Sequence, residues 1–222
     1  MGLSRPYLLL YNAASLILWA TCTIRGLSQL FFSPNTIPQI FTNVYPLLLT
    51  TQSLALLEII HSLLRLVRAP VLTTAMQVAS RILLVWGIMY LFQGVIVGEK
   101  YAAAGVGGSQ EVVGLGDYAF LGCLGAWGVT ECIRYGFFAL QLSGVGVPGW
   151  WAWLRYNTFY VLYPLGISSE CLMVYKALGP AGELVSPLYR WFLIAVLGIY
   201  VPGSYILYTH MIKQRRKAMS KK

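Results

Sequence analysis

The stretch from Gly26 to Leu57 contains no aspartate, glutamate, lysine or arginine. Such a run is foreign to soluble domains, in which about a quarter of the residues are charged. Over the whole chain of 222 residues only 10% are charged and 58% are hydrophobic, and the mean hydropathy is +0.67. These values exclude a soluble globular protein and a disordered chain. Two histidines and four cysteines are also too few for a histidine-rich metal centre or a disulfide scaffold. We therefore expect a polytopic membrane protein.

Charge-poor apolar runs of about 20 residues, the length that crosses a bilayer as a helix, recur along the chain. We expect an all-α fold, with a single domain built as a bundle of six transmembrane helices. The predicted helices cover residues 6–24, 44–63, 80–97, 117–139, 151–168 and 189–210. The first is interpreted as a retained helix, because it has no small-residue cleavage site of a signal peptide. The second is placed from residue 44 because prolines and asparagines interrupt the apolar run before it. The glycine-rich segment 101–116 is expected to be a flexible loop.

The lysines and arginines predict the orientation of the bundle, because cytosolic segments carry an excess of positive charge. An even number of spans places both termini on one side. That side then holds twelve of the 16 basic residues, including those of the tail 211–222, and the other side holds Arg25, Lys100, Lys176 and Arg190. Both termini are therefore predicted to be cytosolic. Topology and contact with anionic lipid explain this charge most simply, and binding of an anionic substrate by some arginines is the sharper alternative.

Ionisable side chains inside predicted membrane helices are costly, so they mark candidate functional positions. Glu58, His61 and Arg65 are spaced by three and four residues, which places them on one face of a helix. Glu131 and Arg134 are three residues apart in the fourth helix. Structural ion pairing is the simpler explanation for both groups, although the planar guanidinium of Arg134 also suits a phosphate.

The most informative combination lies towards the end of the fifth helix. Tyr163 and Glu170 are seven residues apart, so they share a helical face and are separated by about 10 Å along the axis. Pro164 removes a backbone hydrogen bond, so a bend is expected nearby. A phenol and a carboxyl group facing one cavity can act as an acid/base pair. The alternative is a proline kink with a tyrosine at the membrane interface and a glutamate at the helix end.

Several strings together carry a resemblance to one family. The most specific is Arg155–Glu170, which contains Tyr-Pro-x-Gly-x-x-x-Glu. The further matching strings are Leu57–His61, Val67–Pro70, Gln77–Arg81, Trp86–Ile88, Thr130–Tyr135 and Tyr200–Gly203. With them the chain resembles, over nearly its whole length, the 3-hydroxyacyl-CoA dehydratases of very-long-chain fatty acid elongation. This family is also known as the protein-tyrosine-phosphatase-like membrane proteins and, in plants, as PASTICCINO.

The resemblance implies a six-helix enzyme of the endoplasmic reticulum membrane. Such an enzyme removes water from a (3R)-3-hydroxyacyl-CoA to give the trans-2-enoyl-CoA, the third step of the elongation cycle. The resemblance also implies that Tyr163 and Glu170 are the catalytic pair. One group must take a proton from carbon 2 and another must protonate the leaving hydroxyl group. We assign Tyr163 to carbon 2 and Glu170 to the hydroxyl group, and the sequence leaves the reverse assignment open.

Coenzyme A carries phosphate groups, which arginine side chains bind well. The candidate ligands for these phosphates are the arginines of the predicted cytosolic side: Arg65, Arg68, Arg81, Arg134 and Arg155. The enolate also needs an oxyanion partner, and the candidates are Tyr156, Tyr160, Ser168 and Ser169. We expect no metal and no other cofactor, because the reaction requires none. The expected partners are the acyl-CoA substrate, membrane lipid and other enzymes of the elongation complex, and not nucleic acid. The main alternative is a non-catalytic membrane scaffold that binds the elongation enzymes. A transporter is the third possibility, but the paired inverted repeats that it predicts are missing beyond a short Arg-Tyr echo.

Overall fold

The computed structural model describes residues 4–93, 95–97 and 114–220. Within these ranges the chain is all-helical, as expected, and contains no strand. Most of the glycine-rich segment 101–116 lies outside the described residues, as do Lys100, Lys221 and Lys222.

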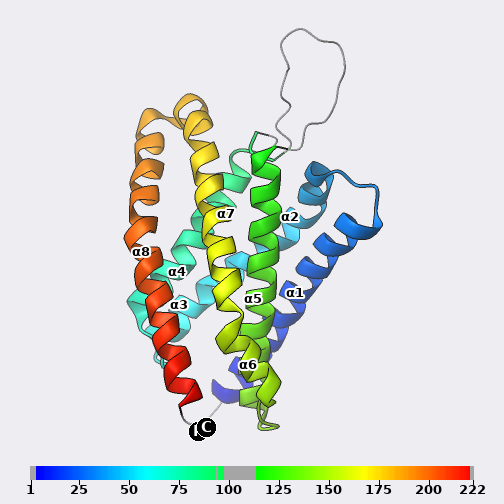
Figure 1. Ribbon diagram of the computed structural model, residues 1–222, viewed down its shortest axis with the longest axis vertical. Coiled ribbons are helices and arrows are strands. Elements are labelled where there is room, and N and C mark those ends of the chain that lie inside the picture. Colours follow the sequence, from blue (N-terminus) through cyan, green and yellow to red (C-terminus); the bar gives the residue numbers. More distant parts are fainter. Residues whose placement is uncertain (1–3, 94, 98–113, 221–222) are drawn as a thin grey trace.

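The helices form rods that cross the bundle in alternating directions (Figure 1). The first four elements are α1 (Ser4–Phe32), α2 (Ile37–Leu54), α3 (Leu56–Leu63) and α4 (Val71–Ile82). The π-helix η1 (Leu83–Tyr90) continues α4, and α5 (Leu115–Ser143) follows. The remaining elements are α6 (Gly149–Asn157), α7 (Phe159–Pro180), the π-helix η2 (Ala181–Val185) and α8 (Pro187–Met219). Both ends of the described chain lie at the same end of the bundle, next to α6 (Figure 1).

Helix α5 is the centre of the bundle and packs most extensively against α1 and α7. Two glycines allow these close approaches. A Cβ atom at Gly128 would lie 2.1 Å from Oγ1 of Thr23 on α1, and one at Gly122 would lie 2.4 Å from Oγ of Ser169 on α7. Small residues at such positions let membrane helices pack closely. Helix α2 packs on the other side of α1, and α8 packs on α7.

Helix α2 begins at Ile37, earlier than the predicted start at residue 44. Pro38 stands in its first turn, where a proline has no helical hydrogen bond to lose. The backbone N–H of Thr36 donates to the side chain of Gln39 at 2.9 Å, which forms part of a capping box. The residues that suggested an interruption therefore start the helix.

Helix α7 extends to Pro180, well beyond the predicted end at residue 168. The prediction ended before Glu170 because this glutamate closes the charge-poor run, but Ser169 and Glu170 are both buried in the bundle. The break in this rod falls at Thr158, between α6 and α7, and Pro164 lies inside α7 without ending it.

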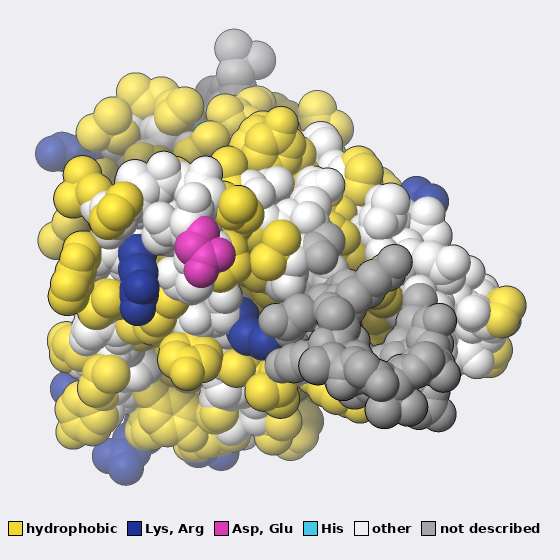
Figure 2. All heavy atoms as spheres, turned by 90° about the horizontal axis from the view of Figure 1, so that it is seen from above, with side chains coloured by type: hydrophobic (Ala, Val, Ile, Leu, Met, Phe, Trp, Pro, Cys, Tyr) yellow, Lys and Arg dark blue, Asp and Glu magenta, His cyan; other side chains and the backbone are white. Residues whose placement is uncertain are grey.

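Among the described residues, four segments are long and apolar enough to cross a membrane: Ser4–Phe32, Ile37–Leu63, Val71–Tyr90 and Pro187–Met219. The outer surface of α8 is strongly apolar, with exposed side chains that include Leu188, Trp191, Val201 and Tyr205. Such a surface fits a bilayer. Viewed from the end opposite the described chain ends, the described surface also carries many hydrophobic and few charged side chains (Figure 2). The chain is therefore a helical membrane protein.

Candidate active site

Glu170 lies near the middle of α7 and is 8% exposed. Each oxygen of its carboxyl group accepts one hydrogen bond from another helix. Nε1 of Trp127 on α5 donates to Oε1 at 2.8 Å, and the hydroxyl group of Tyr200 on α8 donates to Oε2 at 2.9 Å. A buried carboxyl group is costly unless it is hydrogen-bonded, and here two partners fix its orientation.

Tyr163 lies two turns before Glu170 on α7 and is partly buried. Its hydroxyl group donates to the backbone carbonyl of Ser204 at 3.1 Å, and its ring stacks on Tyr208 with a centroid distance of 5.7 Å. Tyr200 and Ser204 are four residues apart, about 6 Å along α8. One turn of α8 therefore contacts both residues of the predicted acid/base pair.

A partly buried network of charged groups lies beside this site and joins α3, α4 and α5. Arg134 binds Glu131 at 2.5 Å and Glu58 at 2.7 Å, and Arg81 forms a salt bridge with Glu131. The hydroxyl group of Tyr135 also donates to Glu58. The pairing of Glu131 with Arg134 agrees with their spacing in the sequence. Because Glu131 is almost fully buried, its two arginine partners are needed to offset the loss of water around its charge.

Arg81 connects this network to the candidate site. Its guanidinium carbon lies 5.4 Å from the ring centroid of Trp127, within the range of a cation–π contact. The same indole donates to Glu170. The charge network therefore supports the ring that orients the carboxyl group.

The expected common face of Glu58, His61 and Arg65 was wrong, because α3 ends before the arginine. The backbone N–H groups of Arg65 and Leu66 donate to Ser62 and His61, and Arg65 has a φ of 55°. These contacts form a Schellman motif, in which glycine is the usual residue at the left-handed position. His61 instead contacts Tyr7, with 2.8 Å between Nε2 and the tyrosine oxygen, and Glu58 pairs with Arg134.

This motif leaves Arg65 and Arg68 exposed around a hollow of about 470 Å³ at the turn between α3 and α4. Its other lining residues are Ser62, Leu63, Val67, Ala69, Pro70 and Val71. Unlike Arg81 and Arg134, these two arginines form no ion pair among the described residues. Both guanidinium groups are therefore available to an anion.

The remaining predicted substrate contacts gather around the start of α7. The guanidinium carbon of Arg155 lies 4.6 Å from the ring centroids of both Phe137 and Phe138. The Tyr156 ring contacts Phe137 edge-on, and Tyr160 stacks on Phe159. Arg155, Tyr156 and Tyr160 thus belong to an aromatic cluster at the end of the bundle that holds α6.

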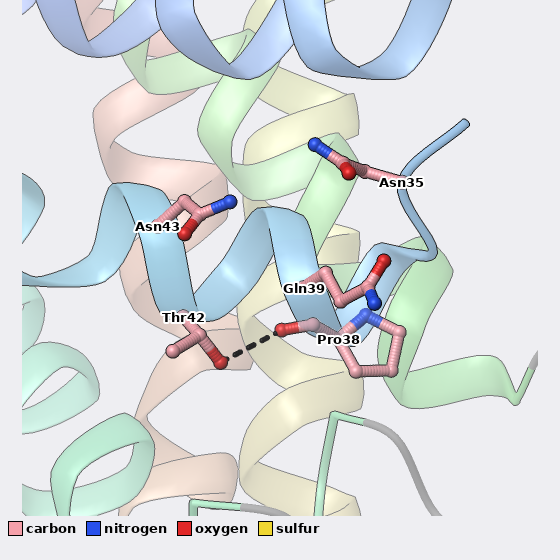
Figure 3. A pocket seen from close by; sticks show the side chains of 5 residues that line it. All are labelled: Asn35, Pro38, Gln39, Thr42 and Asn43. Atoms are coloured by element: carbon pink, nitrogen blue, oxygen red, sulfur yellow. Dashed lines mark hydrogen bonds between the residues drawn. The ribbon is translucent and has the colours of Figure 1, made fainter. Parts of the chain in front are cut away.

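A second hollow, of about 430 Å³, lies at the turn between α1 and α2 (Figure 3). It is lined by Asn35, Pro38, Gln39, Thr42 and Asn43. The Thr42 hydroxyl group donates to the carbonyl of Pro38 at 2.9 Å, as the dashed line shows. Amides, a hydroxyl group and a proline provide no acid or base, so this hollow is unsuited to proton transfer.

Two residues of the site escaped the sequence analysis. Tyr200 stands in one of the strings that carry the family resemblance, but nothing in that string indicated a role. Trp127 is one of seven tryptophans, and a tryptophan in an apolar helix is unremarkable. Only the approach of α5 and α8 to Glu170 reveals both contacts.

The fold and the site define a membrane-embedded helical protein with a buried carboxyl group and a nearby phenol. The family description "Protein tyrosine phosphatase-like protein, PTPLA" matches residues 52–221, and the chain belongs to this family. The membership expected from the resemblance is thereby confirmed.

Curated relatives match the chain over nearly its full length. A Schizosaccharomyces pombe protein named probable very-long-chain (3R)-3-hydroxyacyl-CoA dehydratase is 40% identical over 95% of this chain and 91% of its own length. The dehydratase hpo-8 of Caenorhabditis elegans is 36% identical over 97% of this chain and 95% of its own. The dehydratase PASTICCINO 2 of Arabidopsis thaliana is 35% identical over 98% and 94%. No solved structure matches the chain significantly.

Proposed function

We propose that this protein is a very-long-chain (3R)-3-hydroxyacyl-CoA dehydratase, a hydro-lyase that forms the trans-2-enoyl-CoA. The observation that carries the proposal is the Glu170 carboxyl group, buried and held by two donors, with Tyr163 two turns away on the same helix. The names of the relatives supply the substrate class.

Elimination of water needs two groups with opposite roles. Before each turnover a proton passes from Tyr163 through water to Glu170, so that Tyr163 reacts as a phenolate and Glu170 as a carboxylic acid. The Tyr163 phenolate takes the proton from carbon 2 of the thioester, and the electron pair left behind forms the double bond to carbon 3. Glu170 donates a proton to the hydroxyl group on carbon 3 as the carbon–oxygen bond breaks, so that water leaves. Tyr163 exchanges its hydrogen bond to Ser204 for the substrate before it reacts. Burial supports the acid role of Glu170, because a carboxyl group removed from water favours its neutral form.

The phosphate groups of coenzyme A bind at the hollow that exposes Arg65 and Arg68. Arg155 is the third arginine that contacts these phosphate groups. Tyr156 and Tyr160 lie beside it and line the path by which the substrate enters. Arg81 and Arg134 reach the substrate only by exchanging a glutamate partner, so in the resting protein they hold the bundle around the site.

The protein forms one domain of six membrane spans with both ends in the cytosol. The alternation of the rods supports this arrangement (Figure 1). So do basic contacts at the chain-end side, where Arg5 donates to the carbonyl of Leu142 and Arg215 to the side chain of Asn157. Exposed Trp150 and Trp153 on α6 fit the aromatic belt at a membrane–water interface. In this arrangement α5 and α7 also span the bilayer, shielded by the other helices.

The protein acts in the endoplasmic reticulum membrane, in contact with lipid and with the other enzymes of fatty acid elongation. Location and partners follow from the activity, because the elongation reactions share a membrane-bound acyl-CoA intermediate. The resemblance to the dehydratases of fatty acid elongation supports both.

The test is turnover of a long-chain (3R)-3-hydroxyacyl-CoA by the purified full-length chain in detergent, followed by mass spectrometry. We expect loss of one water from the substrate and formation of the trans-2-enoyl-CoA. A folded protein that makes no product would contradict the proposal and favour a non-catalytic scaffold.

A further inference from the structure

The string Tyr200–Gly203 is one of those that carry the family resemblance, and the proton transfers assigned to Tyr163 and Glu170 do not involve its residues. In the structure it forms the turn of α8 that faces α7 at the site. The hydroxyl group of Tyr200 lies 2.9 Å from Oε2 of Glu170, and the backbone of Ser204, one turn later, accepts from Tyr163.

The two donors to Glu170 differ in chemistry. An indole N–H can only donate a hydrogen bond, whereas a phenol can both donate and accept. Because Trp127 donates to Oε1, that oxygen acts as an acceptor in either protonation state of the carboxyl group. When Glu170 is neutral its proton therefore stands on Oε2, and the Tyr200 hydroxyl group turns away from the donating position that it has in the structure and accepts this proton.

We propose that Tyr200 is a positioning residue for proton donation by Glu170, with Trp127 selecting Oε2 as the oxygen that carries the proton. This inference rests on the proposed dehydratase function. When the Oε2 proton moves to the leaving oxygen and the bond from carbon 3 breaks, a negative charge remains on the carboxyl group. The Tyr200 hydroxyl group then turns back to donate to Oε2, which is the arrangement seen in the structure.

This switch makes the contribution of Tyr200 largest as charge develops during the reaction. An interaction that strengthens towards the transition state raises kcat more than it changes substrate binding. Loss of the Tyr200 hydroxyl group should therefore lower kcat and leave KM nearly unchanged. Replacement of a residue that has only a packing role would not lower kcat while leaving KM unchanged.

The experiment measures kcat and KM of the full-length protein for a long-chain (3R)-3-hydroxyacyl-CoA in detergent. The variants are Tyr200→Phe and Trp127→Phe, each of which removes one donor and keeps an aromatic ring. The matched control is Tyr189→Phe, which removes a hydroxyl group of the same helix that donates to the carbonyl of Gly87 at 2.8 Å. Melting temperatures identify any variant that fails to fold, and the other site variant then decides.

We expect Tyr200→Phe and Trp127→Phe to lower kcat at least about fivefold with KM within about twofold, because fivefold corresponds to the loss of one ordinary hydrogen bond. Tyr189→Phe should leave both constants within about twofold of the wild type. In a Glu170→Asp background, whose shorter side chain moves away from both donors, Tyr200→Phe should lower kcat further by less than about twofold, because coupled residues are non-additive.

A folded Tyr200→Phe variant that keeps more than a fifth of the wild-type kcat would overturn the inference. So would an equal loss of kcat in the wild-type and Glu170→Asp backgrounds. In both cases an active wild type leaves the proposed function standing. A wild type that makes no enoyl-CoA overturns the function itself.

Discussion

Nε1 of Trp127 lies 2.8 Å from Oε1 of Glu170, and this bond crosses from α5 to α7. Close to it along the same interface, Gly122 faces Ser169 so closely that a Cβ atom would lie 2.4 Å from the serine oxygen. The small residue thus allows the separation of the helices at which the indole reaches the carboxyl group.

Replacement of Gly122 by valine should separate α5 from α7 and weaken the Trp127–Glu170 contact. Extra methyl groups in a packed interface destabilise by about 1–3 kcal/mol, so we expect a lower melting temperature together with reduced turnover. The control is Gly125→Ala on the same helix, where an added Cβ meets nothing within 4 Å. If the two variants had the same melting temperature and the same turnover, the close approach at Gly122 would have no bearing on the site.

Glu131→Gln should destabilise the protein by about 3 kcal/mol, because it leaves Arg81 and Arg134 without their shared carboxylate. Thermal unfolding in detergent measures this change. Glu183→Gln is the matched control, since Glu183 is exposed on η2 and forms no ion pair among the described residues. A Glu131→Gln variant as stable as the control would contradict a structural role for the network.

Arg65→Gly should stabilise the fold and weaken substrate binding. Glycine tolerates the left-handed conformation at φ 55°, which costs other residues about 1 kcal/mol. Loss of the guanidinium group should at the same time raise KM for the acyl-CoA about three- to tenfold, by the loss of a charge-assisted contact.

The same increase in KM is expected for Arg68→Gln. This increase in KM should be absent when the substrate is a pantetheine thioester, because that substrate lacks the nucleotide phosphates. Arg25→Gln, an exposed arginine on α1, is the control that should leave KM unchanged. An increase in KM of equal size for both thioesters would argue against a phosphate site between α3 and α4.

The sequence was sufficient to predict the helical class. It also drew attention to Tyr163 and Glu170, because ionisable groups in apolar helices are conspicuous, and their catalytic role stays a prediction. The sequence did not predict side-chain contacts in which the partner residue belongs to another helix. Glu58 was expected to share a face with Arg65, but a left-handed residue ends α3 and Arg134 of α5 provides the charge. The early end predicted for α7 has the same origin, since donors on α5 and α8 allow Glu170 to be buried.

The orientation can be tested by protease treatment of sealed microsomes that contain the protein with a tag at its C-terminus. We expect loss of the tag without detergent, because the basic end of α8 is proposed to be cytosolic. A tag protected until detergent is added would place this end in the lumen and reverse the proposed orientation.

The central claim is that Tyr163 and Glu170 carry out the proton transfers of dehydration. The most direct measurement compares the wild type with Tyr163→Phe and Glu170→Gln, using purified protein, a long-chain (3R)-3-hydroxyacyl-CoA and detection of the enoyl-CoA by mass spectrometry. General acid or base groups typically contribute about 10²–10⁴-fold to a rate, so we predict that both folded variants lose at least about a hundredfold in kcat. Near wild-type turnover by either folded variant would contradict the account.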